Sequence, residues 1–172
     1  MKSNNKLTTA CFAAAALCFG IPSAAAAPDF SVVFPAGLAC SSFDLQIDGW
    51  GGNQHFKEFK DKNGFVRSIS AGTGAALLYT NLDTGKTFST KSNGAVTHVT
   101  SNPDGSSTIT ITGHNVLILF PTDSPAGPST TLYAGRVVFT NVLVSDPPNA
   151  DYWMSTVTSE SGKKTDICAA VD

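Results

Sequence analysis

The sequence predicts an all-β domain, an antiparallel up-and-down meander that closes into a barrel of about 8–10 strands. Turn signals built on glycine and asparagine recur about every ten residues between Gly49 and Gly113. Short segments rich in valine, isoleucine, threonine and aromatic residues separate these turns. Parallel strands would need crossovers of a dozen or more residues, and the connections are shorter, so neighbouring strands must be antiparallel.

Each segment between turns is expected to form one strand. In residues 107–112, Ile109 and Ile111 alternate with threonines, which is typical of a half-buried strand. Closing such strands into a barrel removes the sheet edges that an open sheet must protect. A two-sheet β-sandwich is the alternative. The expected strands cover residues 41–48, 54–60, 65–71, 75–81, 86–92, 95–101, 107–112, 115–120, 130–144 and 152–159.

One turn fixes a register. Residues 102–105 suit a type I turn with a bulge at the glycine, which pairs Asn102 with Ser106 and therefore His98 with Thr110. The histidine then shares a face with several threonines. At the other end of the chain, residues 165–171 are expected to form a single helical turn that carries Cys168.

The N-terminus has the three parts of a secretory signal. Lys2 and Lys6 precede a short apolar run at residues 7–21, and an alanine-rich stretch follows. The run is too short for a membrane span, which needs roughly 20 residues. We therefore expect a signal peptide at 1–26, with cleavage after Ala26 or alternatively after Ala27, an N-terminal extension at 27–39 and a single β domain at 40–172. The expected location is extracellular.

Cysteine usage agrees with export. Two of the four cysteines lie in the predicted signal, and Cys40 and Cys168 remain near the two ends of the domain. In an oxidising compartment such a pair is expected to form a disulfide. Barrel closure would bring the first and last strands, and so the two cysteines, together.

Three segments carry a resemblance. Residues 112–120 and 133–139, followed by the terminal Cys168-Ala169-Ala170, are similar to a group of small secreted β-barrel proteins of actinobacterial type with no assigned activity. The meander also resembles lipocalin-like and allene-oxide-cyclase-like barrels in architecture. The resemblance implies a barrel fold but supplies no catalytic residues, because a fold does not determine a function.

Charge and motifs argue against several classes of function. Without Lys2 and Lys6 the chain has nine basic and thirteen acidic residues, and the basic ones form no stripe, so nucleic acid is not an expected partner. No later segment is apolar enough to span a membrane. The chain has no His-x-His or His-Glu-x-x-His spacing and no phosphate-cradling loop, so neither a metal nor another cofactor is expected.

Five residues are candidates for a site. His98 and Arg136 could act in catalysis or hold a carboxylate if both faced a barrel interior. Trp50, Tyr133 and Trp153 could bind a ligand through their rings. For each, the alternative is an ordinary surface or core residue. Gly135, beside the arginine, is expected to mark a bend at a barrel corner.

Three functions are compatible with these observations. The first is a secreted protein that binds a small apolar or amphipathic ligand inside the barrel, without catalysis. The second is an enzyme of the cyclase or isomerase kind that shapes its substrate in the barrel, with His98 and Arg136 as the acting residues. The third is a secreted surface or interaction protein that uses Trp50 and the proline-rich loop at 121–128. The sequence leaves the oligomeric state open.

Overall fold

The computed structural model describes residues 26–172, so the predicted signal peptide lies almost entirely outside the described residues. Within this range the strands form two antiparallel sheets rather than a closed barrel, so the two-sheet alternative is the one that fits. Sheet A has the order β1-β2-β5-β6, and sheet B has the order β10-β9-β8-β7-β4-β3. The elements are β1 (Phe30–Phe34), β2 (Leu45–Trp50), β3 (Asn53–Lys60), β4 (Val66–Thr73), β5 (Ala76–Asn81), β6 (Thr87–Thr90), β7 (Gly94–Ser101), β8 (Ser107–Leu119), β9 (Ser129–Val144), β10 (Tyr152–Asp166) and α1 (Ile167–Val171).

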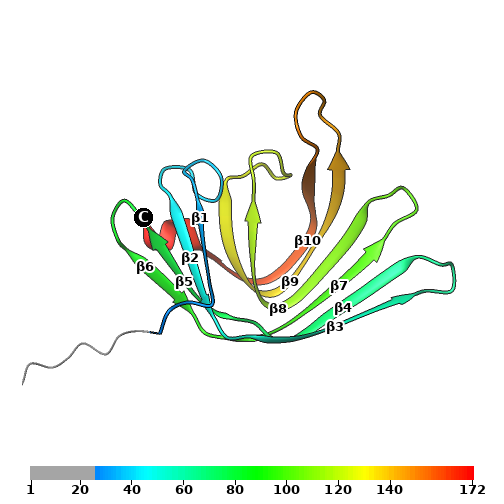
Figure 1. Ribbon diagram of the computed structural model, residues 1–172, viewed down its shortest axis with the longest axis horizontal. Coiled ribbons are helices and arrows are strands. Elements are labelled where there is room, and N and C mark those ends of the chain that lie inside the picture. Colours follow the sequence, from blue (N-terminus) through cyan, green and yellow to red (C-terminus); the bar gives the residue numbers. More distant parts are fainter. Residues whose placement is uncertain (1–25) are drawn as a thin grey trace, which may run out of the picture.

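The two sheets are parts of one meander. Trp50 pairs with Ala76 at the end of β2, and Asn53 pairs with Thr73 at the start of β3, so the register continues without a shift from sheet A into sheet B. Strands β2 and β3 are thus consecutive halves of one hairpin arm, and β4 and β5 form the other arm. Figure 1 shows this hairpin bending where sheet A, at the left, meets the part of sheet B that extends to the right. The predicted antiparallel pairing is therefore confirmed, but the predicted strand order is not, because β2 pairs with β5 and not with β3.

A row of glycines creases sheet B across its strands. Gly113 pairs with Gly135, which pairs with Gly162, and Gly72 lies two strands away in the same row. A Cβ atom at Gly135 would lie 2.1 Å from the carbonyl oxygen of Ser161, so only glycine allows the backbones to approach this closely. Three of the four also have positive φ, which glycine adopts at no steric cost. Gly135 thus lies at a bend, as expected, but in an open sheet.

At the crease sheet B folds back on itself. In a flat sheet, Leu119 of β8 and Val157 of β10 would lie about 33 Å apart along the strands, at roughly 3.3 Å per residue. Both side chains instead line one small pocket. Residues 114–119, 129–134 and 163–166 therefore form a middle layer, and we call the rest of sheet B the wing. In Figure 1 the bent strands β8, β9 and β10 rise between sheet A and the wing.

The middle layer packs apolar side chains of β8 and β9 on both of its faces, whereas its β10 part is exposed or half-buried. Val116, Ile118 and Leu132 pack against sheet A, with Leu45, Ile47 and Tyr79 in the same cluster. The alternate residues of the middle layer pack toward the wing, in a second cluster with side chains from beyond the crease. This second cluster contains Leu117, Leu119, Tyr133, Val137 and Phe139.

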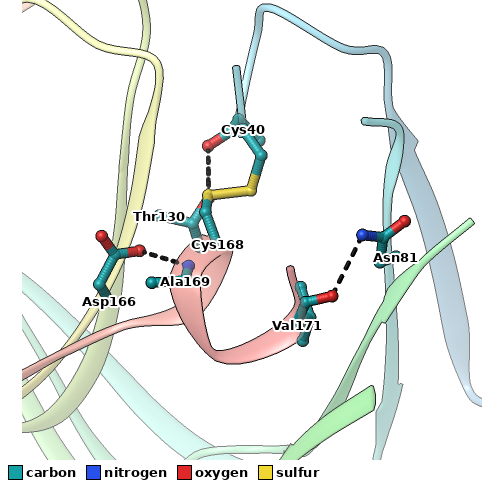
Figure 2. The surroundings of a disulfide bond; sticks show 8 residues. Cys40, Asn81, Thr130, Asp166, Cys168, Ala169 and Val171 are labelled. Atoms are coloured by element: carbon teal, nitrogen blue, oxygen red, sulfur yellow. Dashed lines mark hydrogen bonds between the residues drawn. A yellow bond between two sulfur atoms is a disulfide. The ribbon is translucent and has the colours of Figure 1, made fainter. Parts of the chain in front are cut away.

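The predicted disulfide is confirmed. Cys40 and Cys168 are bonded, with their Cα atoms 5.6 Å apart. Figure 2 shows the bond joining the loop before β2 to helix α1, the predicted C-terminal turn. The Asp166 carboxylate caps this helix by accepting from the Ala169 amide, while the buried Asn81 side chain donates to the Val171 carbonyl at 3.1 Å. The loop that carries Cys40 and the C-terminal segment therefore meet through the docked helix, not through barrel closure.

Some predicted strand boundaries were wrong. Strand β1 lies within residues 27–39, which were expected to be an extension. The segments 107–112 and 115–120 were predicted as two strands but form one, β8, which bends at Gly113. The turn-based register is confirmed, because the amide of Asn102 donates to the carbonyl of Ser106 and His98 pairs with Thr110.

Candidate functional site

The larger of two cavities among the described residues lies where the two sheets separate. Its volume is about 470 Å³, within the range of small-molecule sites. Strands β5 and β6 of sheet A form one wall, and the middle layer forms the other, through residues of β8 and β9. The cavity forms because the strands of the wing separate at the crease. Strands β3, β4 and β7 continue into sheet A, whereas β8, β9 and β10 bend into the middle layer.

The cavity wall is mainly apolar, with a polar rim. Lys91 and His114 line the cavity and are both exposed, so they bring cationic or proton-donating groups to its opening. Within residues 26–172 no aspartate or glutamate lines it. Such a lining favours a ligand with an apolar body and an acidic group. The apolar lining residues are Phe30, Ala75, Leu77, Phe88, Ala95, Val116 and Leu132.

Local sequence choices place two parts of this lining. The Phe30 ring packs on Gly49 of β2 and lines the cavity. A Cβ atom at position 49 would lie 2.2 Å from this ring, so only glycine allows the contact. On the opposite side, the Gly74 amide donates to the Asn93 carbonyl at 2.8 Å, and the Ser92 hydroxyl donates to the Gly74 carbonyl. These bonds fix the segment that carries Lys91.

The two predicted catalytic candidates do not meet in a cavity. His98 in β7 and Arg136 in β9 are both exposed, and neither lines the large cavity or the smaller pocket. Strand β8 separates them, with Thr110 opposite the histidine and Thr112 opposite the arginine. The arrangement gives no shared site in which they could act on one substrate.

The predicted aromatic candidates lie in three different places. Trp50 ends β2 and is half-buried, and its indole nitrogen donates to the carbonyl of Ala26 at 3.0 Å. Trp153 in β10 is 57% exposed on the wing. Tyr133 is buried and lines a pocket of about 250 Å³ between the middle layer and the wing. None of the three lines the large cavity.

The pocket at Tyr133 holds a short polar network. The tyrosine hydroxyl donates to the Glu160 carboxylate at 2.9 Å, and Lys164 forms an ion pair with the same carboxylate. Burial, and then the nearby carboxylate, raises the pKa of Tyr133 to about 12. Hydrogen bonds from Lys164 and Tyr133 lower the pKa of Glu160. The hydroxyl therefore stays protonated and holds the two sides of the crease together.

Among the described residues, no group of three or more histidine, cysteine, aspartate or glutamate side chains is placed to hold a metal ion. In the same range, no helix has the length and apolar character needed to cross a membrane. Comparisons of the chain with protein-family models, with curated proteins and with solved structures found no match.

Sequence reasoning missed the cavity. Its lining comes from β1, β3, β5, β6, β7, β8 and β9, and a single sequence does not bring these segments together. His114 lies between Gly113 and Asn115, the residues of the last predicted turn signal, and so no sequence feature placed it in a cavity. The sequence signal that could have indicated the cavity is the set of four glycines that mark the crease. They fall in one row once the strands are paired.

Proposed function

We propose that this protein binds a small amphipathic ligand, with an apolar body and an acidic group, in the cavity between sheet A and the middle layer. The observation that supports this is the lining, in which apolar side chains predominate, Lys91 and His114 are exposed, and no aspartate or glutamate of residues 26–172 takes part. Apolar walls supply affinity through burial, and a few polar groups orient the ligand.

We also propose that the protein acts outside the cell. The disulfide between Cys40 and Cys168 supports this, because such bonds form and persist in oxidising compartments. The predicted signal at 1–26 points the same way. Expression of the full chain in a secreting host should yield mature protein in the medium whose first residue is Ala27 or Pro28 by mass spectrometry. Intact chain retained in the cytosol would contradict this part of the proposal.

The ligand proposal is tested with a matched pair of probes. Dodecanoate and dodecanol have the same apolar chain and differ in the acidic group. Each is titrated against the mature protein carrying an anionic naphthalene-sulfonate dye, and displacement is followed by fluorescence. We expect both to bind, with dodecanoate the tighter. The absence of any displacement by either probe would contradict the proposal.

A pair of lysine variants locates the site. Lys91→Ala should weaken dodecanoate about tenfold, because it removes a charge-assisted contact worth roughly 1.5 kcal/mol, and should leave dodecanol unchanged. Lys62→Ala is the control, because this lysine is exposed in the turn after β3, far along the wing. Equal effects of the two substitutions on dodecanoate would place binding elsewhere.

A further inference from the structure

Strand β3, the outer strand of the wing, is one of the two edges of sheet B. All eight of its residues are exposed, including Phe56 at 66% and Phe59 at 47%. Strand β1 covers the same edge of the hairpin arm along β2, pairing Phe30 with Gly49 through Phe34 with Leu45. Within the described residues no strand continues this cover along β3.

The backbone groups at this edge are oriented outward on alternate residues. At the turn after β3, the amide of Asp61 donates to the carbonyl of Phe65. This bond shows that the odd-numbered residues of β3 are the ones whose backbone groups bond to β4. In an antiparallel pair the bonded residues alternate. The even-numbered residues from Gln54 to Lys60 therefore direct their N–H and C=O groups away from β4, toward the open edge.

We infer that β3 pairs with β3 of a second copy of this chain, antiparallel, about a two-fold axis through Phe56. A two-fold axis perpendicular to the sheet keeps every side chain on its own face of the sheet. Because opposite residues must share a face and side chains alternate along a strand, the axis must pass through a residue and not between two residues. A centre at Lys57 sets lysine against lysine, and a centre at Glu58 sets glutamate against glutamate. Like charges directly opposite each other destabilise a sheet.

The register centred on Phe56 has no such opposition. The two Phe56 rings face each other, Gln54 faces Glu58 of the second copy and can donate to its carboxylate, and His55 faces Lys57. Strand residues Asn53 to Phe59 all pair, whereas a centre at His55 pairs fewer. Lysines on an edge strand normally discourage pairing, but in this register Lys57 and Lys60 have no lysine directly opposite.

The inference is tested by sedimentation of the mature protein over a roughly hundredfold range of concentration up to about 100 µM. We expect a reversible dimer. Phe56→Glu sets two carboxylates face to face and should raise the dissociation constant at least tenfold. Phe59→Glu is the matched control, because it adds the same charge opposite Asn53, and should change the constant less than threefold. A monomer at all concentrations would overturn the inference, as would a dimer that Phe56→Glu leaves intact.

Crosslinking tests the register independently. Under mild oxidation Phe56→Cys should form a covalent dimer, because residues facing each other in a bonded pair have Cα atoms about 5.5 Å apart, within the range a disulfide spans. Lys57→Cys and Glu58→Cys, which face other residues in this register, should crosslink at least tenfold more slowly. Faster crosslinking of either would overturn the register.

Discussion

Strands β2 and β3 are consecutive parts of one hairpin arm, yet one is buried and the other is bare. In β2 four of six residues are buried, whereas all eight residues of β3 are exposed. Both are fully paired in register with the same neighbouring arm. Pairing therefore does not account for burial. The difference is that the middle layer packs against β2, and within the described residues no layer packs against β3.

The same comparison predicts an uneven distribution of stability. Sheet A, helix α1 and the middle layer share one apolar cluster and the disulfide. The part of the wing made by β3 and β4 has only half-buried or exposed residues on both faces. Regions with few buried apolar contacts open at lower free energy than the core. This part of the wing should therefore exchange its amide hydrogens before sheet A does.

The largest expected effect is loss of the disulfide on the sheet A side. Replacing both Cys40 and Cys168 with serine should lower the free energy of unfolding by about 4–5 kcal/mol, because the bond closes a loop of 128 residues in the unfolded chain. Urea denaturation measures the change, with reduced wild-type protein as the control. A loss below about 1 kcal/mol would mean that the docking of α1 by itself holds the ends together.

A second prediction compares the two strands directly. Leu45→Ala in β2 removes a fully buried side chain and should cost about 2–5 kcal/mol. Phe59→Ala in β3 removes a larger side chain that is half exposed and should cost about 0.5 kcal/mol or less. Both are measured by urea denaturation in dilute protein. Equal costs would mean that β3 has a covering layer and would remove the basis of the comparison.

A third prediction concerns the hydrogen bonds by which Asp123 links the end of the middle layer to the wing. The buried carboxylate of Asp123, in the loop after β8, accepts at 2.7 Å from the amides of Phe120 and Ser155. Asp123→Ala should cost about 2–3 kcal/mol, because both amides lose a charged acceptor. Hydrogen exchange should show lost protection at Ser155. Asp83→Ala, in an exposed turn, is the control and should leave that protection unchanged.

The smallest expected effect is a change in stability at high pH. The pKa of Tyr133 is about 12 in the folded protein and about 10 when unfolded, so its contribution is complete below pH 10 and is lost as the pH rises toward 12. Burial of the tyrosine is the main cause of the raised pKa, and the exposed, screened Glu160 adds less to it, so we expect a loss of about 1 kcal/mol. Tyr133→Phe should not show it. Parallel losses in both proteins, by urea denaturation at pH 10 and 12, would contradict the assignment.

Local features of the fold could be predicted from the sequence. The turn at 102–105 set the register of His98 with Thr110, and the isoleucines of 107–112 identified a strand. The disulfide followed from the number of cysteines and their positions at the ends of the domain. The turn and the strand depend on residues that are close in sequence. The disulfide depends on two cysteines, which can only be bonded to each other or free.

The prediction of a closed barrel was wrong because the roles of several glycines were misinterpreted. Gly72 and Gly113 both fall within the series of predicted turn signals from Gly49 to Gly113, because glycine is found in turns and in creased strands alike. Only the pairing of the strands places them in one row with Gly135 and Gly162. The cavity could not be predicted for the same reason, since it exists only where the creased strands separate.

The middle layer, packed between two clusters, has a consequence for insertions and deletions in the gene. Val116 and Leu117, adjacent in β8, belong to opposite clusters. Deleting one residue between Gly113 and Leu119 would exchange the two sets of side chains and misdirect both at once. At the wing tip, the turn at 61–65 is exposed or half-buried and could change length without moving either set. Length variation among descendants of this sequence should therefore accumulate at the wing tip and be absent from the second half of β8.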